Sequence, residues 1–254
     1  MSLQACAEIV KRGDPDRFLA VMAAPPGARE VLFPLYAFNV EVARAPWVTD
    51  EPAIAEMRLQ WWRDALEEIG GGGRVRSHEV TTPLAGVLDG KGARSLDALV
   101  AARRWDIYKD AFEDAVHFDE YLDATSGGLL WIAARALAAE EESAVRAAGW
   151  AQGLANWFLA IPELEARGRI PLVDGRPEAI SALAATGLEK LDTARAALRA
   201  MPGSAAPVLF AVWQTRQILS SAAANPQRVA EGALRGSEAR RKLALMWTSA
   251  TRRW

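Results

Sequence analysis

Residues 29–69 read REVLFPLYAFNVEVARAPWVTDEPAIAEMRLQWWRDALEEI, and this stretch decides the fold. Its first half predicts an apolar helical segment from Phe33 to Val42. Its second half predicts a capped amphipathic helix from Asp50 to Ile69. Asn39 and Glu41 are polar residues on the apolar segment. A buried polar group without a partner costs about 1–3 kcal/mol, so we expect both residues to find partners nearby.

The rest of the chain repeats this helical periodicity. Apolar residues recur at three- and four-residue spacing, and alternating runs of Val, Ile and Thr do not occur, which predicts an all-α fold. One helix is expected from Ser95 to about Ala111. Another should run from Phe112 to Ala139, with an interruption near Ser126-Gly127-Gly128, and a third from Glu140 to Ala166. No shift in composition marks a boundary, so residues 1–254 are expected to form one domain.

The composition excludes several classes of function. The chain has 30 basic and 32 acidic residues, a balance that argues against binding nucleic acid. A single cysteine and two histidines exclude cysteine-rich and histidine-rich metal sites. No apolar run reaches the length of a membrane span, and no signal peptide is recognisable at the start. We therefore expect a cytoplasmic location.

Carboxylates spaced four residues apart share a helix face and could hold Mg²⁺ together. Three such sets occur, and we expect solvated faces for most of their members, which are Asp64, Glu68, Asp106, Asp110, Asp114, Asp119 and Asp123. Asp106 stands out because it follows Arg103, Arg104 and Trp105 and could anchor a buried ion pair. Neither a phosphate-binding loop nor a nucleophile elbow is found, so no catalytic residue is assigned.

The C-terminal segment from Ala239 to Trp254 predicts a basic amphipathic helix. It could touch a membrane surface or a partner, or pack as a terminal helix on the bundle. Its basic and apolar members are Arg240, Arg241, Lys242, Arg252, Arg253, Leu243, Leu245, Met246, Trp247 and Trp254.

Four segments together resemble the squalene/phytoene synthase family. They are 36–44 (YAFNVEVAR), 58–66 (RLQWWRDAL), 119–130 (DEYLDATSGGLL) and 149–158 (GWAQGLANWF). The resemblance covers roughly Asp14 to Leu172 and implies an isoprenoid-synthase-like helical bundle with a central cavity. Enzymes of this family condense two prenyl diphosphates head to head. Their chemistry needs two facing aspartate-rich clusters that hold Mg²⁺ on the diphosphates.

This sequence departs from the family pattern at both clusters. The first position holds Ala43, Arg44 and Trp47, and the second holds Ala160 and Glu163-Leu164-Glu165. The arginine expected before the second cluster is Leu159. The residues at 37–41, 160–162 and 168–172 resemble one branch of the family. That branch contains a mitochondrial complex I (NADH dehydrogenase) assembly factor, and its members also lack the aspartate clusters.

The resemblance therefore implies a non-catalytic protein that needs no cofactor. Its partner would be a respiratory-complex subunit or an isoprenoid or other lipid ligand, and it could lie peripherally at the inner face of a membrane. The alternative is an active prenyl transferase with shifted Mg²⁺ ligands, for which Asp106, Glu41 and Glu163 would have to converge.

The resemblance also implies which residues line the cavity. The candidates are Tyr36, Asn39, Glu41, Arg44, Arg58, Trp62, Asp106, Tyr121, Asn156 and Glu163. Arg44 stands three residues after Glu41 on one helix face and could pair with it, or it could contact a ligand phosphate without metal. The cavity is expected either to be open or to be filled by Trp47, Trp61, Trp62 and Trp157.

Overall fold

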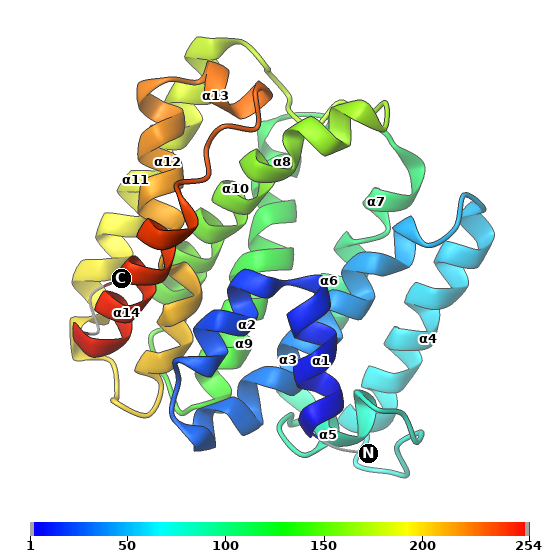
Figure 1. Ribbon diagram of the computed structural model, residues 1–254. Helices are drawn as coiled ribbons and strands as arrows, with labels where there is room; N and C mark the ends of the chain where they lie inside the picture. Colours follow the sequence, from blue (N-terminus) through cyan, green and yellow to red (C-terminus); the bar gives the residue numbers. More distant parts are fainter. Residues whose placement is uncertain (1–2, 252–253) are drawn as a thin grey trace.

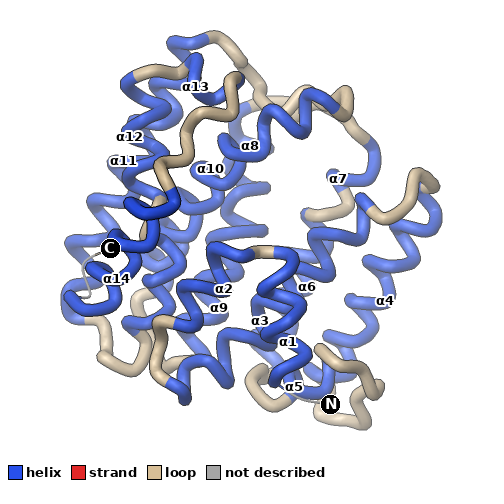
Figure 2. The backbone as a smooth tube through the Cα atoms, in the orientation of Figure 1, coloured by secondary structure: helices blue, strands red, loops and turns tan. Residues whose placement is uncertain are grey.

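Helices form the whole framework in the part that the structure describes, residues 3–251 and 254 of a computed structural model (Figures 1 and 2). They account for 75% of the chain, which confirms the all-α prediction. The α-helices are α1 (Leu3–Gly13), α2 (Pro15–Met22), α3 (Pro26–Arg44), α4 (Pro52–Gly70), α5 (Thr81–Ala85), α6 (Gly90–Ala102), α7 (Trp105–Tyr108), α8 (Ala115–Leu122), α9 (Gly128–Ala136), α10 (Glu142–Ala166), α11 (Pro177–Ala197), α12 (Thr215–Ala224), α13 (Gln227–Ala230) and α14 (Glu238–Thr251). Short 3₁₀ turns are η1 (Ala45–Trp47), η3 (Leu198–Ala200) and η4 (Ala206–Val212), and η2 (Asp123–Gly127) is one π-helical turn.

Local chemistry sets where several helices begin. The side chains of Asp14, Asp89 and Asp114 accept hydrogen bonds from backbone N–H groups at the starts of α2, α6 and α8. Such caps satisfy donors that the helix itself leaves unpaired. Pro15 and Pro52 stand in the first turns of α2 and α4, where proline loses no hydrogen bond.

The core centres on α3 and α10. As expected, α3 is buried along the apolar segment, where Phe33, Leu35, Tyr36 and Phe38 are almost fully covered. Helix α10 packs against α9, α11 and the π-helical turn η2, while α4 packs on α6 and α1 on α3. The helices that hold the two cluster positions, α3 and α10, are thus both central to the bundle (Figure 1).

Helix α10 approaches η2 unusually closely, and glycine makes this possible. A Cβ on Gly149 would lie 2.7 Å from the carbonyl oxygen of Ser126 and 2.9 Å from the Cα of Gly127. A Cβ on Gly153 would lie 2.6 Å from the Ser126 side chain. The predicted interruption near Ser126-Gly127-Gly128 is therefore this π-helical turn, pressed against α10.

The single helix predicted from Ser95 to about Ala111 is wrong, because the structure has two shorter helices there. Asp89, rather than Ser95, caps α6, and the helix ends at Ala102. The short α7 follows and stops at Lys109, whose φ of 58° is left-handed and cannot continue a right-handed helix. Asp106, Asp110 and Asp114 therefore do not form a stripe on one helix, because a left-handed residue and a new cap lie between them.

None of the helices within residues 3–251 is both long enough and apolar enough to cross a bilayer.

Candidate functional site

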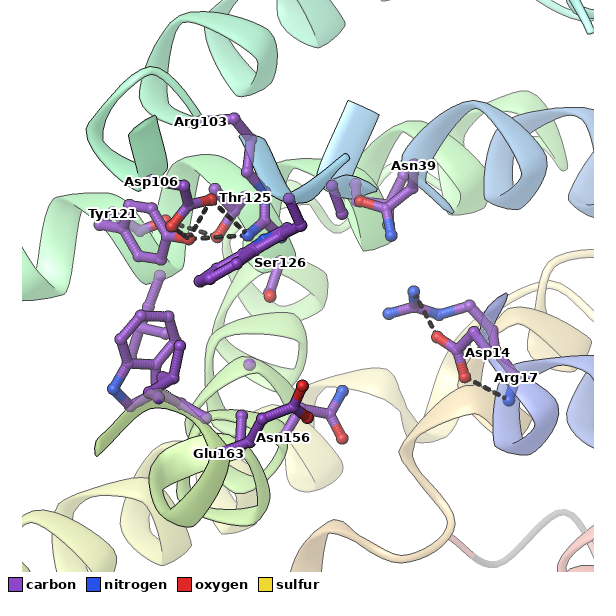
Figure 3. Close-up of a pocket in the computed structure, with 18 of the residues that line it drawn as sticks. Asp14, Arg17, Asn39, Arg103, Asp106, Tyr121, Thr125, Ser126, Asn156 and Glu163 are labelled. Carbon is purple, nitrogen blue, oxygen red and sulfur yellow. Dashed lines mark hydrogen bonds and ion pairs between the residues drawn. The ribbon is translucent and has the colours of Figure 1, made fainter. Parts of the chain in front are cut away.

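A cavity of about 470 Å³ lies between the helices of the core. Figure 3 shows its polar side chains converging from α2, α3, α7, η2 and α10. Trp47 and Trp157 form part of its wall but leave it open. The lining residues are Asp14, Arg17, Asn39, Ala43, Trp47, Arg103, Asp106, Tyr121, Leu122, Thr125, Ser126, Leu129, Gly153, Asn156, Trp157, Ala160, Glu163, Leu164 and Arg167.

Helices α3 and α10, which hold the two cluster positions, contribute one face each to this cavity. Asn39 and Ala43 stand four residues apart on α3 and point the same way. Asn156, Ala160 and Glu163 form the matching face of α10. Both alanines lie in the cavity wall, at the places where the family pattern calls for metal-binding aspartates. A methyl group offers no ligand to a cation, so the two clusters are missing from the site as well as from the sequence.

Asp106 lies at the centre of a buried polar network. Only 2% of the residue is exposed, and its carboxylate accepts hydrogen bonds from the Tyr121 hydroxyl at 3.0 and 3.1 Å and from Arg103 at 3.1 Å. Arg103 also donates to the Tyr121 oxygen at 2.7 Å. Burial raises the pKa of Tyr121, so this hydroxyl stays protonated. The network confirms the buried ion pair predicted for Asp106.

Arg169 extends this network from the loop after α10. Its guanidinium donates to the backbone oxygen of Asp106 and lies over the rings of Trp47, at 4.6 Å, and Trp105, at 5.7 Å. Burial lowers the pKa of Arg169, and Asp106 and Tyr121 offset this only in part. Asp106 therefore balances the charge of Arg103 with its carboxylate, and its backbone oxygen holds Arg169 and the loop against the cavity.

A second ion pair stands on the opposite side of the cavity. Arg17 contacts Asp14 at 3.0 Å, and its guanidinium lies 4.9 Å from the centre of the Tyr36 ring. Burial raises the pKa of Tyr36 to about 12. Three buried atoms here find no hydrogen-bond partner among the described residues, namely Arg17 Nε, the Tyr36 hydroxyl and Asn39 Oδ1. These polar atoms without a hydrogen-bond partner therefore lie beside the open cavity.

Every carboxylate in the cavity wall already has an arginine partner. Asp14 contacts Arg17, Asp106 contacts Arg103, and Glu163 contacts Arg167 at 2.6 Å. Magnesium prefers several free carboxylate oxygens, which these pairs do not offer. Across the described part of the chain, no three His, Cys, Asp or Glu side chains are grouped so as to hold a metal ion. The donor set does not fit the metal–diphosphate chemistry that the fold supports elsewhere.

Five of the ten candidate residues line the cavity. Asn39 comes from α3, Asp106 from α7, Tyr121 from α8, and Asn156 and Glu163 from α10. Their roles toward a ligand stay predictions, but their convergence from separate helices is a property of the structure (Figure 3).

The other five candidates are not among the residues that line this cavity. Glu41 and Arg44 are rotated away from the face of α3 that holds Asn39. They contact each other at 3.1 Å, which confirms the predicted pair. Tyr36 is buried beneath Arg17. Arg58 is exposed on α4, and Trp62 packs edge-on against Phe38, because α4 faces α6 rather than the cavity.

Sequence reasoning missed the residues that reach the cavity from outside the motif helices. The missed polar groups are Asp14, Arg17, Arg103, Thr125, Ser126 and Arg167 in the lining, and Arg169 just behind it. The Asp14-x-x-Arg17 spacing was visible as a helix cap followed by a partner one turn later. Nothing in the sequence indicated that this helix start would face α10.

A second hollow adjoins the cavity between α2, α10, α12 and η4. It shares Asp14, Arg17, Asn156, Ala160 and Glu163 with the first. On its outer side Asp16 pairs with Arg235 at 3.0 Å and also with Arg241 of α14. The C-terminal part of the chain therefore forms the outer wall of this hollow.

Comparisons with known proteins agree with this architecture. Residues 10–173 match the sequence profile described as Squalene/phytoene synthase. A Drosophila melanogaster protein named as a homolog of NADH dehydrogenase (ubiquinone) complex I, assembly factor 6, is 32% identical over 178 residues, which are 66% of this chain and 53% of that protein. The Bos taurus and Homo sapiens proteins named complex I assembly factor 6 are each 25% identical over 180 residues, 65% of this chain and 51% of theirs.

The chain thus spans about half the length of the curated relatives it matches. Among solved structures, a dehydrosqualene synthase crystallised with a ligand superimposes with a TM-score of 0.79 at 13% identity, over 98% of this chain and 95% of that one. The squalene synthase HpnC from Alicyclobacillus acidocaldarius gives a TM-score of 0.58 at 16% identity, over 98% and 90%. At these identities the structures show the fold, and they confirm the isoprenoid-synthase-like bundle.

Proposed function

The chain belongs to the squalene/phytoene synthase family, and on that premise we propose that it is a non-catalytic member with an assembly-type role toward a respiratory complex. One observation carries the first half of the proposal. The two faces that should present aspartates to the cavity present Ala43 and Ala160 instead. Ionising a prenyl diphosphate needs charge neutralisation by metal, and these faces provide no ligands for it.

The geometry does not support the alternative proposal, an active prenyl transferase with shifted Mg²⁺ ligands. It required Glu41, Asp106 and Glu163 to converge. Glu41 lies outside the cavity wall and is paired with Arg44, while Asp106 and Glu163 are held by Arg103 and Arg167. Recruiting them for Mg²⁺ would break three ion pairs, one of them buried.

The relatives support the second half of the proposal. Three animal proteins that align with about two thirds of this chain are named complex I assembly factor 6 or its homolog. The role proposed here would reside in the helical part that this chain shares with them.

A synthase assay tests the absence of catalysis. Purified protein is incubated with Mg²⁺ and farnesyl or geranylgeranyl diphosphate, beside an active family enzyme, and organic extracts are analysed by mass spectrometry. We expect a condensation product from the enzyme and none from this chain. A condensation product formed by the purified chain at a rate above that of a heat-inactivated sample would refute the proposal.

Affinity capture tests the assembly role. The tagged chain is expressed in a host with an intact respiratory chain, native membranes are solubilised gently, and captured proteins are identified against a tag-only control. Enrichment of subunits or assembly intermediates of the NADH dehydrogenase complex is the expected result. Capture of the chain alone, or of proteins equally abundant in the control, would count against this role.

The cavity supports a ligand-binding role that is compatible with the first. We propose an isoprenoid or other lipid-like ligand, because the space is open, its wall includes Trp47, Leu129 and Trp157, and unpartnered polar atoms of Arg17 and Asn39 stand beside it. Native mass spectrometry of the purified chain should detect bound lipid. Ala160→Phe, which fills the cavity, should abolish it, whereas Ala166→Phe on the exposed side of the same helix should not. Equal lipid occupancy in both variants would contradict this role.

A further inference from the structure

Helix α14 lies on the outside of the bundle (Figure 1) and carries exposed apolar side chains. Leu243, Met246 and Trp247 are 64%, 66% and 62% exposed and lie on one face, three and four residues apart. Leu245 and Thr248, on the opposite face, are buried against the bundle. Three large apolar side chains side by side at such exposure are unusual for a surface that water alone covers.

This helix is fixed in its orientation by contacts on its inner side. Arg241 donates to Asp16 and, at 2.7 Å, to Gln214, and it lies over the Trp213 ring. Trp254 packs against the core, with the Arg195 guanidinium 5.8 Å from its ring centre. The outward face of α14 is therefore a preformed surface.

The segment that carries this surface is rich in basic residues. Residues 239–254 contain five basic residues and no acidic residue, although the whole chain carries a net charge of −2. Arg240 is exposed, and the described part of the structure gives its side chain no acidic partner. Lys242 pairs with Glu238 at 2.7 Å. Arg252 and Arg253, which the sequence also placed in this basic segment, lie outside the described residues.

We propose that the outward face of α14, formed by Leu243, Met246 and Trp247 and bordered by basic residues, docks on an anionic lipid bilayer. An amphipathic helix with Trp and aliphatic residues on one side and basic residues beside them partitions into the interface between headgroups and acyl chains. Each basic residue near an anionic surface adds attraction that salt screens. This inference is independent of the proposed function, since it uses neither the cavity nor the motif helices.

A site-specific fluorophore tests the orientation of docking. Cys6 is fully buried and its thiol pKa is raised to about 11, so a cysteine introduced by Met246→Cys can be labelled alone. Met57→Cys on α4 is the matched control, because Met57 is 71% exposed on another part of the surface. With vesicles of phosphatidylcholine and phosphatidylglycerol, the emission from position 246 should shift to the blue, and that from position 57 should not. No shift at 246, or equal shifts at both positions, overturns the proposal.

Sedimentation with the same vesicles measures the strength of docking without a label. Trp247→Ser should lower the partition coefficient roughly tenfold or more, since it removes one inserted side chain. Arg240→Gln should lower it about fivefold, and pure phosphatidylcholine or high salt should weaken binding likewise. Met57→Ser should leave it unchanged. If vesicle binding is unchanged by Trp247→Ser and by lipid charge, the proposal that this face docks on a bilayer is refuted. The face would then be one for a protein partner.

Discussion

Asp106→Asn is expected to lower the free energy of unfolding far more than any other single carboxylate-to-amide change in the cavity wall. The substitution keeps the shape of the side chain but removes the charge that pairs with Arg103 and that favours the charged form of nearby Arg169. Its carboxylate now accepts from Tyr121 at 3.0 Å and from Arg103 at 3.1 Å in an almost fully buried position. After substitution Arg103 loses its counter-charge, whereas the contact of Arg169 with the backbone oxygen remains.

Removing one partner from a buried ion pair typically costs about 3–5 kcal/mol, because the remaining charge stays desolvated. For a chain of this length, that loss corresponds to a fall in melting temperature of roughly 6–20 °C. Tyr121→Phe should cost less, about 1–3 kcal/mol, because it leaves the charge pair in place and removes one hydroxyl. The two substitutions should not be additive, since they act on the same network.

Urea unfolding followed by far-UV circular dichroism measures these differences, with melting temperature as a second readout. Asp110→Asn is the matched control, since Asp110 is an exposed aspartate four residues along the chain and should change stability by no more than about 0.5 kcal/mol. If Asp106→Asn and Asp110→Asn shifted the unfolding midpoint equally, the buried network would not have the role assigned to it.

Three further predictions concern other parts of the molecule. Gly149→Ala should destabilise by about 1–3 kcal/mol because its Cβ meets backbone atoms of Ser126 and Gly127, whereas Gly175→Ala, with open space around it, should not; calorimetry that shows equal melting would contradict the close packing. Arg44→Asp should create no tight Mg²⁺ site in isothermal titration, because Arg44 is 59% exposed beside Glu41 and lies away from the cavity; tight binding would revive the metal hypothesis. The free energy of unfolding should fall as pH rises from about 9 to 11, because burial raises the pKa of Cys6 to about 11 and the unfolded chain loses the thiol proton first. Urea midpoints of the wild type that stay constant over this pH range would refute this link between Cys6 and stability.

Local signals made much of the fold predictable from sequence. Asp14-Pro15 marked the start of α2, and the apolar run from Phe33 to Val42 marked the most buried part of α3. The pairing of Arg44 with Glu41 followed from a spacing of three residues on one helix. Each of these inferences needs only neighbours within about two helical turns.

The cavity was less predictable because it depends on how helices are rotated and which distant segments meet. The burial of Asp106 was foreseeable from the arginines before it, but its contact with Arg169, 63 residues away, was not. Arg58 and Trp62 matched a family motif, yet α4 turns them toward solvent and toward Phe38. A sequence motif identifies a helix and leaves open which of its faces reaches the site.

The pairing of Asp16 with Arg235 and Arg241 also sets an order of events during synthesis. The partners are 219 and 225 residues apart along the chain. A ribosome adds residues at about 5–20 per second, so Asp16 waits roughly 10–45 s for the arginines that will neutralise it. Late in that interval the nascent chain has most of its helices but still lacks the outer wall of the second hollow. Arg235 and Arg241, which close this hollow from outside, are made long after Asp16, and a nascent-chain chaperone would meet the bundle with that side still open.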